Sequence, residues 1–302
     1  MKRIYLLLTA MSMFLASYAQ EIRVSNAKDF LKSIDDNRTI IVGSTSALNL
    51  TEALLQLHEE DSIKYPRFKY VGLEELFGKI ANASSDSDNQ EIDDDLDTPQ
   101  KGIYIQDEEN GPRVCIAGIK NLTIKGEGPV APVLISELFL EFNGCSNLTL
   151  DNLALCGLYL TEMKKASITN CDLRGGRLNC DDLSNLNFVN CQIHDSHDGI
   201  IHALDCGELY FEHCAFFNCS YEDIEIKDNE INGIKIAKMG MLVFSCKTVC
   251  FNKCIFYQNQ GRLFGSCPSI KLKNCFVSHP IENRGEISQI KDKKSVWFDT
   301  PR

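Results

Sequence analysis

The densest group of chemically active side chains in the sequence lies between His194 and Gly199. Two histidines and two carboxylates, from His194, Asp195, His197 and Asp198, fall within five residues. An imidazole beside a carboxylate is a typical arrangement for general acid–base catalysis, because the carboxylate orients the ring that exchanges the proton. Turns also select Asp, Ser, His and Gly for their backbone geometry alone. Which interpretation holds depends on the neighbours that the fold brings to this corner.

A repeat of apolar and thiol residues organises the chain around this cluster. Seven copies begin at Ile119, Cys145, Met163, Leu183, Cys206, Cys246 and Cys267. Each copy has an apolar residue or cysteine at its first, fourth and sixth positions, and most copies add a cysteine at the ninth and an apolar residue at the eleventh. Residues two apart share one face of a strand, so these pairs of positions mark two successive strands whose side chains point inward.

A third inward pair precedes most copies and completes a turn of three short strands. Its members are Leu140 and Phe142, Leu158 and Leu160, Ile201 and Ala203, and Met241 and Val243. Three strands per turn predict an all-β fold, a parallel β-helix. The leucine-rich repeat shares part of this signature and is the alternative, but its repeats carry a helical segment of nearly constant length, whereas the remainder here alternates with period two and varies in length.

The corner between two of the strands carries asparagine in several copies. These residues are Asn152, Asn170, Asn190 and Asn274, and His213 and Lys253 interrupt the series. Asparagine tolerates the left-handed backbone that a sharp corner requires. The corners are therefore predicted to stack along the axis of the solenoid.

The two ends of the chain differ from the repeat. Residues 1–19 combine Lys2 and Arg3 with a short apolar run and an A-x-A-like site, which predicts a signal peptide and a secreted or periplasmic protein. We expect an N-terminal cap and insertion over residues 20–112, β-helix coils over 113–278 and a C-terminal cap over 279–302. The cap contains a predicted helix from Ser25 to Ile34 and a strand over 38–42. The insertion contains predicted short helices at 51–57 and 72–80 and a solvated acidic loop over 85–97.

Charge and cysteine content restrict the partners and cofactors that we expect. The net charge is −11 and the sequence lacks any stripe of Lys and Arg, so we expect no binding to nucleic acid and no membrane insertion. Nine of the fourteen cysteines occupy inward repeat positions, which favours free core thiols over disulfides, with Cys219 and Cys250 as exceptions. No cofactor or metal is predicted, and the expected form is a monomer.

The run from Gly118 to Gly128, together with Phe142 to Leu150 and Ile168 to Leu173, resembles right-handed β-helix proteins of the pectin-lyase-like superfamily. The resemblance covers residues 22–42 and 112–278. It implies a right-handed parallel β-helix with an N-terminal capping helix. Members of this superfamily include polysaccharide lyases, hydrolases and secreted proteins without an assigned reaction, so the resemblance implies the fold and leaves the activity open.

Stacked coils would align residues one turn apart on the outer surface near His194. Arg174, His194 and Phe217 occupy equivalent positions in successive turns, about 4.8 Å apart. The candidate catalytic residues are His194, Asp195 and Arg174, and the candidate substrate-binding residues are Asp172, His197, Asp198 and Phe217.

Three functions compete. The leading interpretation is a β-helix scaffold that binds a polysaccharide or glycan. The first alternative is a polysaccharide lyase or glycoside hydrolase acting on uronic-acid-containing chains, for which a cation, an imidazole and an aromatic ring would suit an acidic sugar. The second alternative is a surface interaction protein of the leucine-rich-repeat kind.

Overall fold

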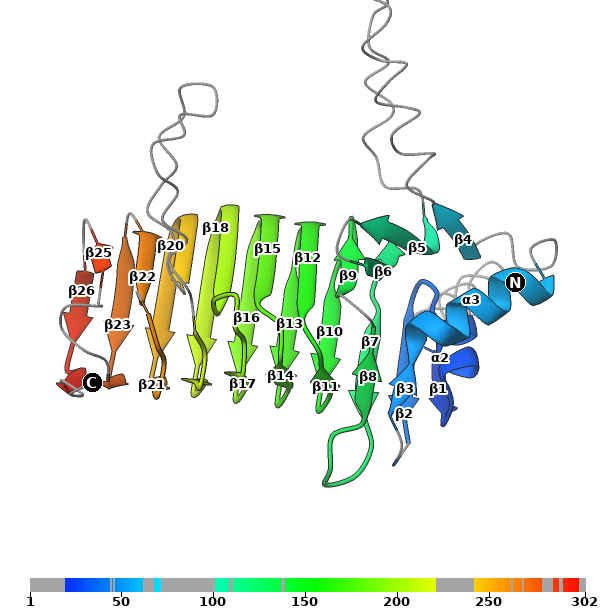
Figure 1. The fold of residues 1–302 in the computed structure, drawn as a ribbon, viewed down its shortest axis with the longest axis horizontal. Coiled ribbons are helices and arrows are strands. Elements are labelled where there is room, and N and C mark those ends of the chain that lie inside the picture. The colour runs from blue at the N-terminus through cyan, green and yellow to red at the C-terminus, as the bar shows by residue number, and fades with distance from the viewer. Residues whose placement is uncertain are drawn as a thin grey trace, which may run out of the picture.

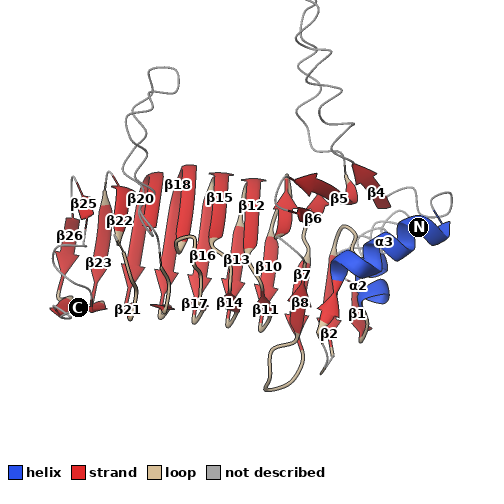
Figure 2. Cartoon of the chain, viewed as in Figure 1, coloured by secondary structure: helices blue, strands red, loops and turns tan. Residues whose placement is uncertain are grey.

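The computed structural model is a right-handed β-solenoid with two helices at its N-terminal end (Figures 1 and 2). It describes residues 20–43, 45, 47–61, 68–71, 101–108, 111–136, 139–220, 242–261, 263–267, 269–278, 285–287 and 290–298. The predicted signal peptide, the acidic loop and the predicted helix at 72–80 lie outside these residues. No helix within the described segments is long and apolar enough to cross a membrane.

The coils have three faces. The first face stacks β6 (Gly111–Ala117), β9 (Leu140–Asn143), β12 (Leu158–Met163), β15 (Leu178–Leu183), the first halves of β18 (Ile201–Glu212) and β20 (Leu242–Asn252), β22 (Phe264–Cys267) and β25 (Gly285–Ile287). The second face stacks β1 (Gln20–Val24), β2 (Arg38–Val42), β7 (Thr123–Gly126), β10 (Leu148–Asp151), β13 (Ala166–Thr169), β16 (Asn185–Val189), the second halves of β18 and β20, β23 (Ile270–Lys273) and β26 (Ile290–Lys293). The third face is a sheet of nine described strands: β3 (Leu48–Asn49), β8 (Val133–Ile135), β11 (Ala154–Leu155), β14 (Asp172–Arg174), β17 (Gln192–His194), β19 (Ala215–Phe217), β21 (Ile255–Tyr257), β24 (Phe276–Ser278) and β27 (Val296–Phe298). All strands within a face run parallel, as the sequence predicted, and none of the described coils from β6 onward contains a helix, so the leucine-rich-repeat alternative is wrong.

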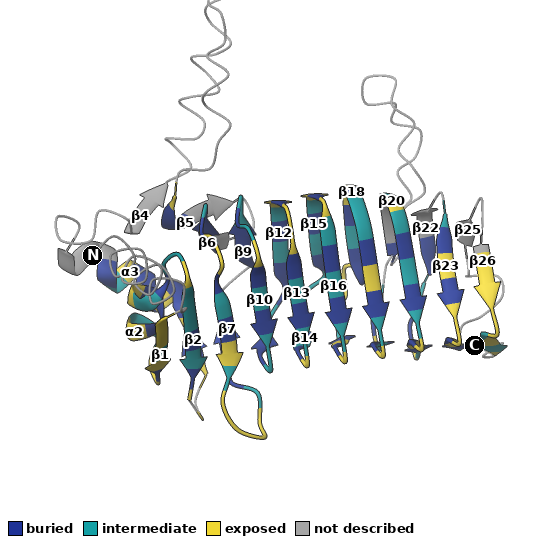
Figure 3. Cartoon of the chain, turned by 180° about the vertical axis from the view of Figure 1, so that it is seen from behind, coloured by how far each residue is buried: buried dark blue, intermediate teal, exposed yellow. Residues whose placement is uncertain are grey.

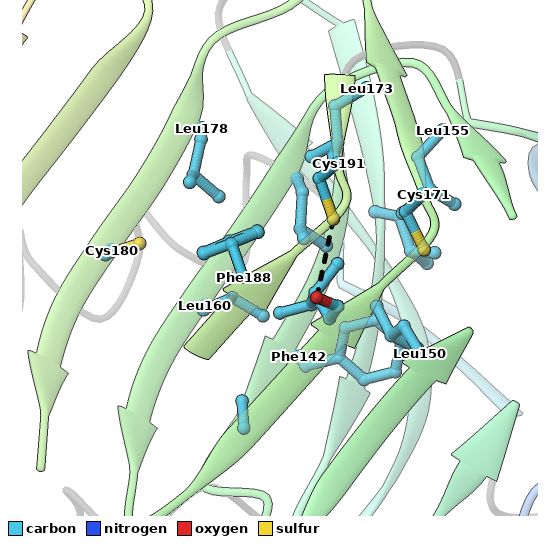
Figure 4. Close-up of a cluster of buried hydrophobic side chains, with 14 of the residues drawn as sticks. Phe142, Leu150, Leu155, Leu160, Cys171, Leu173, Leu178, Cys180, Phe188 and Cys191 are labelled. Carbon is cyan, nitrogen blue, oxygen red and sulfur yellow. Dashed lines mark hydrogen bonds between the residues drawn. The ribbon is translucent and has the colours of Figure 1, made fainter. Parts of the chain in front are cut away.

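The inward repeat positions fill a continuous core. Leucine, isoleucine, phenylalanine and cysteine side chains from the three faces meet inside the solenoid, and Figure 4 shows one such group around Phe142, Phe188 and Cys191. Rings in successive coils stack directly, with centroids of Phe188 and Phe211 5.0 Å apart and those of Phe211 and Phe251 4.9 Å apart. Burial of these side chains is what holds consecutive coils in register.

The corner positions adopt the left-handed backbone that the asparagine series predicted. Asn152, Asn170 and Asn190 have φ of 54°, 53° and 56°. His213 and Lys253 have φ of 54° and 55°. The corner geometry therefore persists where the asparagine series is interrupted, and main-chain hydrogen bonds between coils continue through it.

The N-terminal segment contributes coils as well as a cap. Strands β1 and β2 pair with each other, and β2 pairs with β7, so the described part of the solenoid already includes Gln20–Val24, ahead of the predicted first coil. Helix α2 (Ala27–Ser33) begins after Asn26, whose side-chain oxygen accepts the main-chain N–H of Asp29; Asn26 rather than Ser25 is the N-cap. Helix α3 (Leu50–Asp61) contains the predicted helix at 51–57.

An antiparallel hairpin that the sequence did not predict follows α3. Strand β5 (Gly102–Glu108) runs antiparallel to β6 and parallel to β4 (Phe68–Val71). The hairpin joins the solenoid through β6, which pairs with β9 in the first face.

Two further boundaries differ from those predicted. Leu242 pairs with Ile201 and is buried, so the inward series of β20 is displaced by one residue from the predicted Met241 and Val243. Strands β26 and β27 pair in parallel with β23 and β24, so another coil follows Ser278, where the sequence placed a separate cap.

Candidate functional site

The predicted candidate residues lie on the outer side of the third face. The inward residues Leu173, Ile193 and Phe216 are buried and fix the strands β14, β17 and β19 in register. That register aligns Arg174, His194 and Phe217 in one outward row, each one coil from the next. The buried residue of each strand therefore sets the position of the outward residue that follows it.

His194 is held on both of its ring nitrogens by carboxylates. Nε2 lies 2.6 Å from Oδ1 of Asp172, and Nδ1 lies 2.7 Å from Oδ2 of Asp195. A neutral imidazole has one N–H and can donate to one of these oxygens, whereas the protonated ring donates to both. The ring is also stacked on Phe217, with centroids 4.6 Å apart and planes 6° apart. Its orientation is thereby fixed, and neither nitrogen is left over for a substrate proton.

Asp195 connects His194 to the next coil through its side-chain hydrogen bonds. It has a left-handed backbone with φ of 56°, and its side chain accepts hydrogen bonds from Asn218 in the next coil and from His194. These two hydrogen bonds, Asn218 first, hold the pKa of the Asp195 carboxyl below its ordinary value. Asp195 is therefore a charged partner that positions His194.

The cationic side chains near His194 are paired with carboxylates. Nη2 of Arg174 lies 3.6 Å from Oδ2 of Asp172. Nη1 of Arg177 lies 3.0 Å from Oδ2 of Asp198. The pair with Asp172 compensates the positive charge of Arg174, the cation that we expected from the sequence to contact an acidic sugar.

The side chains of His197 and Asp198 interact with residues other than His194. Nδ1 of His197 lies 3.2 Å from Oγ of Ser220, and Asp198 pairs with Arg177. Both side chains are exposed. Ser196, between them and Asp195, is fully buried, so the corner from His194 to Asp198 does not lie wholly outside the core as expected. The catalytic and binding roles given to these residues stay predictions.

Tyr257, which was not predicted from the sequence, extends the aromatic row. Its ring stacks on Phe217 with centroids 5.0 Å and planes 13° apart, so His194, Phe217 and Tyr257 form one stack across three coils. All three follow the eleventh repeat position by one residue, and this spacing could have revealed Tyr257.

A second outward row of the third face is apolar over its C-terminal half. Ala215, Ile255, Phe276 and Val296 pair in register in successive strands. Ile255 is 43%, Phe276 38% and Val296 51% exposed. We call this row and the neighbouring ring stack the third-face surface. Large apolar side chains gathered in register on an outer sheet face are typical of a binding surface.

No group of three or more His, Cys, Asp or Glu side chains in the described segments is arranged to hold a metal ion. The third-face surface consists of apolar and aromatic side chains, bordered at one end by the paired charges around His194.

Comparisons with known proteins agree with the fold and do not extend to an activity. Neither the curated proteins nor the solved structures gave a match. The family model described as the right handed beta helix region matches residues 96–279, which is more than half of the chain. With its parallel three-faced coils, the chain belongs to the right-handed β-helix family, consistent with the pectin-lyase-like superfamily.

Proposed function

We propose that this β-helix is a scaffold whose third-face surface binds a polysaccharide or glycan. The observation that carries the proposal is the ring stack of His194, Phe217 and Tyr257 beside an exposed apolar row. Sugar rings present apolar C–H faces that pack against such side chains, while a few fixed polar groups orient the ligand. Asp172 and Asp195, already ordered by His194, supply acceptors for sugar hydroxyls at one end.

The coil spacing also suits a polymer. Strands of neighbouring coils lie about 4.8 Å apart, so equivalent side chains recur at short, regular intervals along the axis. A chain of sugar units lying along the solenoid would meet similar side chains at each coil. Binding in this orientation is expected to strengthen with the length of the oligosaccharide.

The test compares the purified chain of residues 20–302 with a Phe217→Ala/Tyr257→Ala variant against a panel of soluble polysaccharides by titration calorimetry. We expect the variant to bind at least roughly tenfold more weakly, because the loss of two partly buried rings removes apolar contact area. Tyr210→Ala is the matched control: Tyr210 is an exposed tyrosine, 37% accessible, on the second face. Equal binding by the double variant, or no binding to any polysaccharide, would overturn the proposal.

A second candidate, cleavage of a uronic-acid-containing chain, rests on the placement of His194 between Asp172 and Asp195. The geometry favours binding, because a general base needs one nitrogen directed at the substrate. Release of reducing ends by the intact chain, lost in His194→Ala, would establish the enzyme instead. Release that persists in His194→Ala would place catalysis elsewhere.

A further inference from the structure

Six lysines gather on the second face and its corner at the C-terminal end of the solenoid. Lys271 and Lys273 lie on β23, Lys291 and Lys293 lie on β26, and Lys253 and Lys294 occupy corners that lead to the third face; we call these six the lysine stripe. All six are exposed, and Figure 3 shows exposed residues on β23 and β26. The sequence led us to expect no basic stripe in a chain of net charge −11, and that expectation was wrong for these coils.

The coil register places like charges side by side. Lys271 pairs with Lys291, and Lys273 pairs with Lys293, in strands about 4.8 Å apart. Like charges directly opposite each other destabilise a sheet. In the described parts of the chain no ion pair joins any of the six lysines to a carboxylate. The stripe therefore carries positive charge that an external anion would neutralise.

Protection of a sheet edge accounts for part of the stripe. Lysines on an edge strand discourage pairing with another chain, and β26 is the last described strand of its face. The same reason does not apply to β23, which pairs with β20 on one side and with β26 on the other. Lys271 and Lys273 need another explanation.

The lysine stripe borders the apolar row of the third-face surface. Lys253 precedes Ile255 by two residues, and Lys294 precedes Val296 by two residues. Both lysines have left-handed backbones, with φ of 55° and 63°, at the corner where the chain turns from the second face to the third. One ligand could therefore contact cations on one side of the corner and apolar side chains on the other.

We infer that the glycan bound by this protein is anionic, with carboxylate or sulfate groups that contact the lysine stripe while its sugar rings pack on the third-face surface. The inference rests on the proposed function and adds the ligand class. The acidic groups of the ligand would then contact the C-terminal coils rather than the His194 corner, because the cations near His194 are already paired with carboxylates.

A single polysaccharide chain fits the stripe better than a broad polyanion. Screening limits electrostatic attraction and repulsion to about 8 Å at physiological ionic strength. A flexible chain can stay within that distance of the lysines. A membrane or a nucleic-acid duplex would also approach the rest of a protein whose net charge is −11.

The test uses polygalacturonate and its fully methyl-esterified form, which share a backbone and differ in charge. Binding of the chain of residues 20–302 is measured by titration calorimetry, with Lys271→Gln/Lys273→Gln as the variant. Lys164→Gln/Lys165→Gln is the matched control, because it removes the same charge from two exposed lysines outside the stripe. We expect the stripe variant to bind polygalacturonate roughly fivefold or more weakly, the control to bind as the parent does, and added salt to weaken binding.

The outcomes separate the inference from the proposed function. Binding of the esterified chain alone, weakened by Phe217→Ala/Tyr257→Ala, would overturn the anionic ligand and leave glycan binding in place. Binding of neither polymer nor any other polysaccharide of the panel would overturn both. Equal binding of single-stranded DNA or of phosphatidylglycerol vesicles, lost in the same stripe variant, would overturn selectivity for a glycan.

Discussion

The cysteines show how a reactive residue type is used as a core residue. Burial raises the pKa of Cys171 to about 12 and the pKa of Cys145 and Cys219 to about 11, so these thiols stay protonated. Sγ of Cys191 donates to the carbonyl oxygen of Ile168 at 3.4 Å, and similar contacts recur in other coils. The thirteen cysteines whose side chains the structure describes are free thiols. Cys219 is buried, as most of the cysteines are, so its expected exception was wrong, whereas Cys250 is only partly buried, as Cys156 and Cys246 are.

His202 provides a prediction at the residue scale. It is partly buried on the first face, its Nε2 has no hydrogen-bond partner, and burial together with nearby Arg177 lowers its pKa to about 4. The unfolded chain binds a proton here below about pH 6.5, whereas the folded chain does not until about pH 4. Stability is therefore expected to fall by about 1–3 kcal/mol as the pH drops from 6.5 to 4, with no further loss from this group below that range.

The measurement is urea unfolding of the parent chain and of His202→Gln at several pH values between 7 and 4. The variant should lose less free energy of unfolding across this interval than the parent. His213→Gln, at an exposed corner, is the control and should follow the parent. Identical pH profiles for the parent and His202→Gln would show that His202 is accessible to protons in the folded state.

At the scale of the elements, the corners set the path of each coil. Asn190 has φ of 56°, its main-chain N–H donates to the carbonyl oxygen of Glu212, and its side chain donates to Asn170 at 3.3 Å. Asn190→Val is expected to cost about 1–2 kcal/mol or more of unfolding free energy, because a β-branched residue is strained in this conformation.

Asn190→Gly should cost less than Asn190→Val, because glycine adopts positive φ without strain. The comparison, by chemical denaturation, separates the backbone strain from the lost side-chain hydrogen bond. If glycine were as destabilising as valine, the side-chain contact with Asn170 would be the dominant contribution at this corner.

The sequence predicts the coils well where inward positions are regularly apolar, and it fails where another group takes such a position. In the last coil, Asp292 pairs with Leu272, which interrupts the apolar pattern. The Trp297 Nε1–H donates to Asp292 at 2.8 Å and the main-chain N–H of Ser295 at 3.2 Å; although partial burial raises the pKa of Asp292, these bonds outweigh it and hold the pKa below its ordinary value. The coil is therefore built with a hydrogen-bonded carboxylate that periodicity does not reveal.

At the candidate site, too, the sequence predicted some of the neighbouring residues and missed others. Coil spacing predicted that Arg174, His194 and Phe217 would be neighbours, because register follows from the buried residues between them. It did not predict that both nitrogens of His194 face carboxylates, since Asp172 and Asp195 reach the ring from different coils. The lysine stripe was missed because its members are spread over forty-two residues of sequence and meet only after coiling.

At the scale of the whole molecule, the two ends of the solenoid are protected differently. Helices α2 and α3 lie at the N-terminal end, where Phe30, Leu31 and Leu54 are buried (Figure 1). At the C-terminal end, β26 carries Lys291 and Lys293 on its exposed outer side. An uncovered strand with neutral side chains offers a template for another chain.

Lys291→Thr/Lys293→Thr is therefore expected to associate with itself as its concentration rises, while the parent chain stays monomeric. Threonine favours strands and removes the repulsion between two approaching edges. Sedimentation velocity over a range of concentrations measures the change, and Lys164→Thr/Lys165→Thr is the control. A variant that stays monomeric would assign protection of this end to another part of the chain.

The register between β18 and β20 has a practical consequence for engineering. The chain leaves one coil at Ser220, and Leu242 pairs with Ile201 in the preceding coil although residues 221–241 intervene. Ser220 itself pairs with Gln260 in the following coil. The two strands stay paired across this junction with one irregularity, between Ala203 and Cys206, so a fluorescent reporter could be inserted between Ser220 and Leu242 while both chain ends remain native.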